Sequence, residues 1–387
     1  MSEEVAKTWQ EDLNGAMKTN NTNPLDAGDW STLESLLPPW RAEAERAGLL
    51  KRTSEERLEL VLRVVLLHVA TGSSLKVATA MSAAGQVLDL SAVALHQWMK
   101  KLGPLFASML TAMTDGTQRF AAELWSGYVI YMVDASTVCR PGSKGTTARV
   151  HSAMRLSDLQ CVHIEVTDER GGETFRRFRH KAGSGELWIG DRGYANPPGI
   201  AALSEKGSDV LVRYNRGSLP LYDAEGKIIE LSTLLGTLVD SHSPKEWPVW
   251  VHSKRKKPIE GRLVAVRLPP EKAEEARVRL RREYGKKVSA ESLSSAEFVM
   301  LFTTVPTHRL SAALILKLYT LRWQIELGFK RDKSIAGLDR LPNFRPDTIY
   351  TWIVAKMLLT QITRNVATDP VAFPPSGQSW GRTCAAA

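Results

Sequence analysis

A short apolar run rich in Val, Ile and Tyr opens the middle of the chain: SGYVIYMVDAS, residues 126–136. Runs of this length and composition are typical of a buried strand. Residues 31–125 instead carry the longer period of helices, as in SEERLELVLRVVLLHVATG, which has a capping signal at Ser54 and a Gly72 stop. The sequence therefore predicts that a sheet begins near residue 126.

Further strand patterns follow up to residue 215. Apolar and polar residues alternate as in strands in TARVHSAMRL and QCVHIEVTDE. A further strand pattern, GELWIGD, ends at Asp191. The last one, SDVLVRYN, comes after a short helix that starts at Pro197-Pro198. This order predicts a mixed five-stranded sheet with helices on its faces, in the α/β class. It matches the ribonuclease-H-like fold.

Two aspartates share a context in this region. Asp134 and Asp191 each end an apolar strand and precede small or turn-forming residues. A carboxylate at a strand exit can reach a crevice while its backbone stays rigid, and Mg²⁺ prefers oxygen ligands. The alternative is that each aspartate is only a turn residue or a helix cap.

A helix expected from Ser311 to Ile335 contains LYTLRWQIELGFKRDK, residues 318–333. At roughly 100° per residue, five polar side chains lie at about 0°, −60°, −20°, 20° and −40°: Tyr319, Arg322, Glu326, Lys330 and Lys333. Trp323, at about 40°, borders this face. The alternative is a solvated salt-bridge face, because Arg322–Glu326 and Glu326–Lys330 are i,i+4 pairs. Flanking apolar residues favour a helix anchored on its other side.

Tyr319-x2-Arg322-x3-Glu326-x6-Lys333 resembles the Tyr-Arg-Glu-Lys signature of the insertion-sequence-4 family of DDE transposases. Asp134-Ala-Ser-Thr resembles the first catalytic aspartate of that family, and Asp191-Arg-Gly-Tyr resembles the second. The motifs stand in family order over roughly residues 126–345. The resemblance also implies a mostly β insertion between the second and third acids.

The resemblance implies that Asp134, Asp191 and Glu326 hold two Mg²⁺ ions, for which Mn²⁺ is expected to substitute. One ion would activate water or a 3′ hydroxyl, and the other would stabilise the leaving oxygen. The expected enzyme cleaves double-stranded DNA at transposon ends, through a hairpin, and joins them to target DNA. A homodimer would hold the two ends.

Further residues are expected to contact DNA. Arg322, Lys333 and Tyr319 would bind phosphates without reading sequence, and Lys330 would add a contact. The resemblance implies that an aromatic residue in the last strand of the insertion stacks on a flipped base, and Phe298 occupies that place. A buried strand phenylalanine is the alternative. Trp323 either stacks on DNA or packs, and Arg192 and Tyr194 either line the site or form an ordinary turn.

Five segments are expected. They are a flexible arm (1–30), a helical DNA-binding region (31–125), the catalytic core (126–215 and 300–365), a β-rich insertion domain (216–299) and an irregular tail (366–387). Within the helical region, residues 75–106 fit a helix-turn-helix or a plain helical hairpin. Four side chains could face DNA there: His96, Gln97, Lys100 and Lys101.

Composition is consistent with this assignment. The chain has 51 Lys and Arg against 42 Asp and Glu, and the resulting basic surface attracts phosphate polymers. Its three cysteines form no disulfide framework, although Cys384 fits a prenylation pattern by spacing alone. The N-terminus is not a signal peptide and no apolar run is long enough to span a bilayer. We therefore expect a cytoplasmic, nucleoid-associated bacterial protein.

Three other functions stay open at this point: a catalytically inactive or domesticated transposase-derived DNA-binding protein, a ribonuclease-H-like nuclease that never joins strands, and a basic structural protein. Competing acids rank lower because none terminates a long buried strand: Asp158, Glu165 and Asp168. His151 and His163 have no ligand partner at useful spacing, so we expect both to be structural.

Overall fold

The computed structural model of the chain describes residues 27–115, 125–143, 145–238, 243–254, 256–285, 288–341 and 346–368. The expected arm up to residue 26, and the expected tail from residue 369 with Cys384, lie outside these residues. The chain divides into two compact units. We call residues 1–113 with 336–387 the helical unit, and residues 114–335 the sheet unit.

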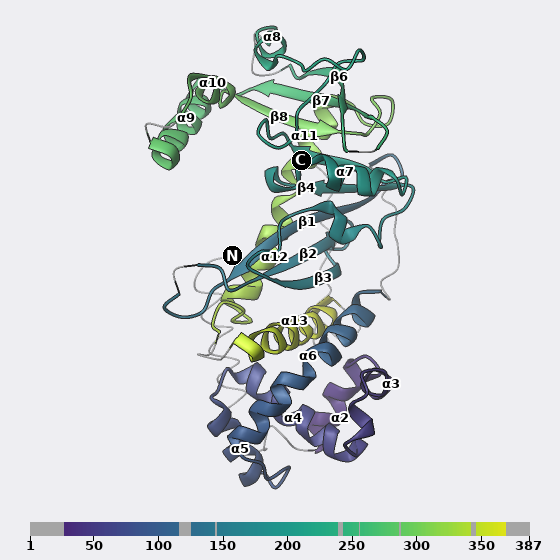
Figure 1. Cartoon of the computed structure of the whole chain (residues 1–387), viewed down its shortest axis with the longest axis vertical. Helices are drawn as coiled ribbons and strands as arrows, with labels where there is room; N and C mark the ends of the chain where they lie inside the picture. Colours follow the sequence, from purple (N-terminus) through teal and green to yellow (C-terminus); the bar gives the residue numbers. More distant parts are fainter. Residues whose placement is uncertain are drawn as a thin grey trace, which may run out of the picture. The chain divides into compact units, whose positions relative to one another are not determined.

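The helical unit is built mainly from α-helices, which Figure 1 draws in purple, blue and yellow. The Ser54 and Ser74 hydroxyls accept hydrogen bonds from the first turns of α4 and α5, and Gly72 ends α4 in the left-handed region. A turn at residues 85–91 joins α5 to α6. The elements are α2 (Ala27–Leu36), α3 (Trp40–Arg46), η1 (Leu49–Lys51), α4 (Glu55–Thr71), α5 (Leu75–Ala84), α6 (Ala92–Asp115) and α13 (Pro346–Thr368).

Helix α13 packs in the helical unit, whereas the sequence placed residues 348–363 with the catalytic core. The Lys356 ammonium donates to the carbonyl of Val69 at 2.7 Å, near the end of α4, where helix carbonyls lack partners. Gly103 of α6 lies so close to α13 that an added Cβ would be 2.8 Å from Thr351 Oγ1. The ends also differ from the expected boundaries, because α2 begins at Ala27 and α13 continues to Thr368.

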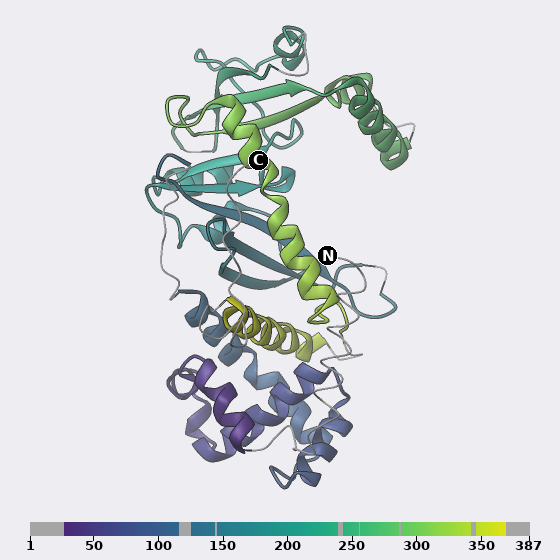
Figure 2. The ribbon, with the colours of Figure 1, turned by 180° about the vertical axis from the view of Figure 1, so that it is seen from behind.

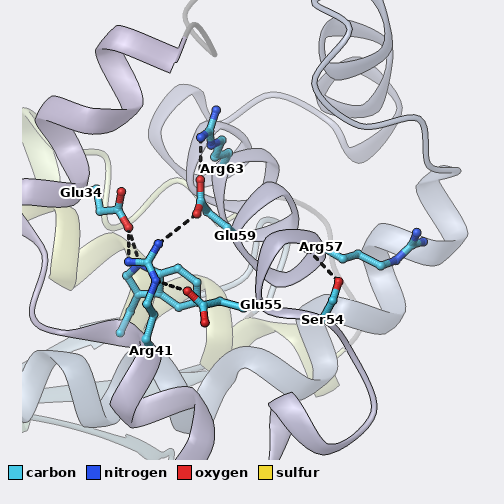
Figure 3. A network of polar contacts seen from close by, with 8 residues as sticks. Glu34, Arg41, Ser54, Glu55, Arg57, Glu59 and Arg63 are labelled. Carbon is cyan, nitrogen blue, oxygen red and sulfur yellow. Dashed lines mark hydrogen bonds and ion pairs between the residues drawn. The ribbon is translucent and has the colours of Figure 1, made fainter.

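Arg41 ties the first helices together (Figure 3). Its guanidinium pairs with Glu34 of α2 at 2.5 Å and with Glu59 of α4 at 3.1 Å, and it also pairs with Glu55. The neighbouring Trp40 is buried and donates from its indole nitrogen to Glu34 at 3.0 Å. A buried aromatic and a shared cation therefore fix α3 between α2 and α4.

The sheet unit holds one eight-stranded sheet in the order β3-β2-β1-β4-β5-β8-β7-β6. β1 pairs in parallel with β4, and β4 with β5, while the other pairs are antiparallel. The strands are β1 (Val129–Val138), β2 (Ala148–Arg155), β3 (Cys161–Asp168), β4 (Glu186–Gly190), β5 (Asp209–Arg213), β6 (Lys245–Val251), β7 (Ile259–Arg267) and β8 (Phe298–Thr303).

The five predicted strands are present as β1 to β5, but the sheet extends beyond them into the predicted insertion. β8 pairs with β5 through Val212↔Phe302 on one edge and with β7 through Val264↔Leu301 on the other. Because both edges of β8 carry hydrogen bonds, the insertion strands extend the core sheet instead of forming their own. The insertion also contains α8 (Leu231–Leu235), α9 (Pro270–Tyr284) and α10 (Ala290–Ser295).

Both faces of the sheet are covered. Ile130, Ile189 and Leu211 pack with Ile315 and Leu318 under α11 (Ala312–Thr320), which continues into α12 (Trp323–Ser334), light green in Figure 2. Alternate strand residues pack on the opposite face with α7 (Pro197–Ser204) and η3 (Phe175–Phe178). A strand turns successive side chains to opposite faces, so the position of each polar residue fixes the face it serves.

Candidate functional site

Three polar residues stand near the place where the pairing of the parallel strands ends. Met132 pairs with Ile189, and Ile189 pairs with Leu211. Asp134 of β1 stands two residues past this pairing, Asp191 directly follows the last residue of β4, and Arg213 is the last residue of β5. The charge of Asp191 acts on the pKa of Asp134. The fold thus brings the two predicted aspartates together, and Arg213 ends the next strand of the sheet.

The backbone holds both aspartates. Asp134 Oδ1 accepts a hydrogen bond from the Ala135 amide at 2.8 Å. Asp191 Oδ1 accepts one from the Gly193 amide at 2.8 Å and caps the short helix η4 (Arg192–Tyr194). The alternative role of Asp191 as a helix cap is therefore also realised, and the cap orients its carboxylate.

The predicted continuous helix from Ser311 to Ile335 is interrupted at Leu321–Arg322. The amides of Leu321 and Arg322 bond to the carbonyls of Leu318 and Tyr319, three residues back. Such bonds tighten the turn to about 120° per residue and align positions i and i+3. The two side chains therefore point in more similar directions than they would in an ideal α-helix. The guanidinium carbon of Arg322 lies 5.8 Å from the centre of the Tyr319 ring.

Glu326 lies on α12, which packs against β1. The Arg322 guanidinium donates to the Glu326 carboxylate across one turn. The Arg322 side chain is 16% exposed and that of Glu326 is 46% exposed. The expected i,i+4 pair is therefore present, and it ties the third acid to the site.

Charge is concentrated around Asp134. Burial raises the pKa of Asp134 to about 7, and the charges of Asp191 and Glu173 act in the same direction. The Ala135 amide and Arg322 oppose this rise. Clustered anions in a low dielectric repel one another, so a cation bound there would stabilise them.

The donor set fits a hard divalent cation in its chemistry, because carboxylate oxygens are the ligands that Mg²⁺ prefers. Within the described ranges no group of three or more acid, histidine or cysteine side chains stands at coordination spacing. Glu326 is paired with Arg322, so a cation would compete with that guanidinium for the third carboxylate. Asp134 and Asp191 are thus the fixed pair of the set.

The other predicted contact residues differ in exposure. Lys330 and Arg192 are exposed, Trp323 is 55% exposed, and Tyr319 and Lys333 are half-buried. Tyr194 is fully buried. The first five remain accessible to a ligand at least in part.

The prediction that Phe298 stacks on a flipped base is not supported. Phe298 is 9% exposed and belongs to the core cluster on the α7 face. The Arg267 guanidinium carbon stands 5.9 Å from its ring centre. The alternative of a buried strand phenylalanine describes it, because its position in β8 turns the side chain inward.

The expected helix-turn-helix contacts are partly engaged within the helical unit. Lys100 pairs with Asp347 of α13 at 2.5 Å, and Lys101 stands 5.5 Å from the Trp98 ring centre. Gln97 is exposed and His96 is half-buried. Gln97 and Lys101 are therefore the most accessible of the four residues.

Strand pairing reveals residues that sequence patterns missed. Burial, Arg192, Arg322 and Arg279 of α9 lower the pKa of Arg213, so four guanidinium groups gather near the site. Arg192 and Arg213 have no carboxylate partner among the described residues. Glu173 also joins the anionic group. The alternation in SDVLVRYN marked Arg213 as a strand residue, but only the order of strands in the sheet places its strand next to the one that Asp191 follows.

The lower-ranked acids and the histidines have local roles. Asp158 pairs with Arg155, Glu165 pairs with Arg177 at 2.6 Å, and Asp168 accepts from the Arg170 amide at 3.0 Å. His151 is buried with its Nε2 3.0 Å from the Thr167 hydroxyl. The rings of His163 and His180 meet edge to face at 4.9 Å. These contacts agree with structural roles.

A family described as the transposase DDE domain matches residues 125–362, which is more than half of the chain. The chain belongs to the DDE transposase family. It is 34% identical over 341 residues to a putative transposase of insertion sequence element IS186A from Escherichia coli strain K12, covering 86% of this chain and 91% of the relative. Identity is also 34%, over 342 residues with the same coverage, to the transposase for insertion sequence element IS421 from Escherichia coli.

Membership of the DDE transposase family makes DNA the substrate and a ribonuclease-H-like core the expected fold, in agreement with the mixed sheet. Relatives named as transposases over most of the chain do not favour the inactive, purely structural or nuclease-only alternatives. In the described part of this DDE transposase, no helix is long and apolar enough to cross a bilayer.

Proposed function

We propose that this chain is the transposase of an insertion sequence in the insertion-sequence-4 family. It would cut DNA at the terminal inverted repeats, in a cut-and-paste reaction with a hairpin step, and join the ends to target DNA. One observation carries the proposal: Asp134 on β1 and Asp191 directly after β4 follow the same parallel strand pairing, and α12, which bears the Arg322–Glu326 pair, packs against β1.

Asp134, Asp191 and Glu326 would hold the divalent ions, Mg²⁺ or Mn²⁺. When bound, the ions supply an activated water or 3′ hydroxyl and stabilise the leaving oxygen. Asp134 and Asp191 are oriented by backbone amides at 2.8 Å, so they provide fixed ligands. Glu326 would give up its bond to Arg322 in order to hold an ion, which would leave the Arg322 guanidinium available to DNA.

Positive charge beside the acids would hold the DNA backbone. Arg322, Tyr319 and Lys333 would bind phosphates at the cut, and Lys330 would add a contact on α12. Arg192 and Arg213 lack carboxylate partners in the described ranges, so their charge is available for a phosphate. Such contacts position the duplex but do not read its sequence.

Exposed Trp323 would stack on a base near the active site. In the helical unit, Gln97 and Lys101 on α6 would contact the terminal repeats, as the second helix of a helix-turn-helix does. A homodimer would bring two ends together. The net charge of +9 supports salt-sensitive binding to DNA.

The test is a cleavage assay with full-length protein, Mg²⁺ and duplex DNA bearing the inverted repeats that flank its gene. Glu326→Gln should remove cleavage while leaving DNA binding and thermal unfolding unchanged. Glu283→Gln on α9, an acid outside the site, is the matched control. Cleavage by Glu326→Gln at the rate of the unaltered protein would show that the third ligand is wrong. Cleavage without strand transfer by the unaltered protein would favour a nuclease.

A further inference from the structure

Glu173 lies in the loop between β3 and η3, outside the motifs that mark the family. Its carboxylate packs against the backbone of Gly193. If Gly193 carried the Cβ of an alanine, that atom would stand 1.9 Å from Glu173 Oε2. The same Cβ would be 3.2 Å from Asp191 Oδ1, which accepts the Gly193 amide. The carboxylates of Glu173 and Asp191 therefore both lie next to Gly193.

Electrostatics link Glu173 to both aspartates. Burial and the charge of Asp191 raise the pKa of Glu173. The charge of Glu173 in turn raises the pKa of Asp134. Its ion pair with Arg149 of β2 is long, at 3.4 Å. Glu165, by contrast, pairs with Arg177 at the shorter distance of 2.6 Å. Glu173 is thus an anion only partly compensated by protein cations.

Tyr194 provides an independent observation. Its side chain is fully buried, and an added Cβ at Gly190 would stand 2.7 Å from its Cβ. The hydroxyl has no hydrogen-bond partner in the described part of the chain. Besides burial, three carboxylates raise its pKa: Asp134, Glu173 and Asp191. A buried hydroxyl without a partner is unfavourable, and this one is close to the acids.

We propose that Glu173 is a fourth carboxylate of the site, which supplies an oxygen for the divalent cation held by Asp134 and Asp191. The Tyr194 hydroxyl donates a hydrogen bond to the oxygen ligands of that cation. Mg²⁺ needs six oxygen ligands and dehydrates reluctantly. No three acids of the described residues stand at coordination spacing, so Glu173 would hold the ion through one of its water ligands. This inference rests on the proposed metal-dependent function and adds to its ligand set.

The test measures Mn²⁺ binding to the full-length, metal-free protein without DNA, by electron paramagnetic resonance of free Mn²⁺. Glu173→Gln should weaken binding roughly ten- to a hundredfold, as loss of a supporting metal partner typically does. The matched control is Glu165→Gln on β3, which removes a paired acid outside the group and should leave the affinity unchanged. Asp134→Asn tests the proposed site itself. Thermal unfolding in EDTA shows whether each variant is folded.

The outcomes separate the two proposals. If Asp134→Asn binds Mn²⁺ more weakly and Glu173→Gln binds it as well as the unaltered protein, the role of Glu173 is overturned. The proposed function then still stands. Unchanged binding in both variants would overturn both. Should Glu173→Gln unfold, Gly193→Ala decides, because its Cβ would displace the Glu173 carboxylate while keeping the charge. Gly193→Ala should then lower Mn²⁺ affinity, and an unchanged affinity would reject the inference.

Discussion

Arg322 donates a hydrogen bond to the carboxylate of Glu326 from the tight turn that separates α11 from α12. The charge of the same guanidinium opposes the rise in the pKa of Asp134 that burial causes. One cation therefore interacts with an acid on the helix and an acid on the sheet. This position suits a group that exchanges carboxylate partners for a DNA phosphate when the acids bind metal.

Replacing Arg322 should impair DNA processing more than folding. The pair with half-exposed Glu326 contributes roughly 0–1 kcal/mol to stability, whereas a phosphate contact at the cut affects the reaction directly. Arg322→Ala should therefore shift thermal unfolding by a few degrees at most, and it should strongly reduce end cleavage. Arg331→Ala, an exposed residue of the same helix, is the control. A large loss of stability with normal hairpin formation would contradict the prediction.

Asp134 should make metal-free stability depend on pH. Its folded pKa of about 7 lies above its ordinary value of 3.8, so between these values the native state holds a proton that the unfolded chain has released. The free energy of unfolding should fall as pH rises from about 4 to 7, by at most about 4 kcal/mol. Chemical denaturation in EDTA measures this slope.

The substitution Asp134→Asn should remove that part of the slope, although Asp191, Glu173 and Arg322 remain beside it. Added Mg²⁺ should flatten the slope of the unaltered protein, because metal and proton compete for the same oxygens. Identical pH profiles for both proteins in EDTA would show that Asp134 keeps its ordinary pKa.

Gly190 should be required for packing behind the site. A Cβ there would stand 2.7 Å from Tyr194 Cβ and 3.1 Å from Phe175 Cζ, in a core that cannot open easily. Gly190→Ala should lower the free energy of unfolding by roughly 1–3 kcal/mol, as overpacking typically does. Gly172→Ala is the control, since nothing lies within 4 Å of the added carbon. Equal stability of the two variants would refute the packing argument.

Arg213 should contribute to DNA affinity through charge. It ends the strand that pairs with β4, and its guanidinium has no carboxylate partner among the described residues. Arg213→Ala should weaken binding similarly for all DNA sequences and reduce the slope of log affinity against log salt by about 1. Arg170→Ala, with an 88% exposed side chain after β3, is the comparison. An unchanged salt slope would exclude a phosphate contact.

Arg41 should stabilise the helical unit modestly. It bridges acids of α2 and α4 (Figure 3), but its side chain is 45% exposed. Arg41→Ala should lower the free energy of unfolding by about 1 kcal/mol or less at low salt, with a smaller effect at high salt. Arg52→Ala provides an exposed reference. A salt-independent loss would indicate that packing against Trp40 matters more than charge.

Sequence patterns predicted the strands that carry Asp134 and Asp191, because short apolar runs bounded by turns report local structure directly. They also predicted the pair of Arg322 with Glu326, since residues four apart on a helix are neighbours. The sequence did not show the break between α11 and α12 at Leu321–Arg322. There, a few backbone hydrogen bonds span three residues instead of the four of an α-helix. For Phe298 the sequence left stacking on a base and burial in the strand open, because the exposure of this side chain depends on what covers β8.

By itself, the sequence determined which residues can form strands and helices and which acids end the apolar runs, because these properties depend on nearest neighbours along the chain. Only the tertiary structure decided that β6 and β7 extend the core sheet and that α13 packs in the helical unit. It alone placed the strand that ends at Arg213 next to β4, and Glu173 against Gly193. Strand register and loop packing depend on contacts between residues distant in sequence, and no local pattern encodes them.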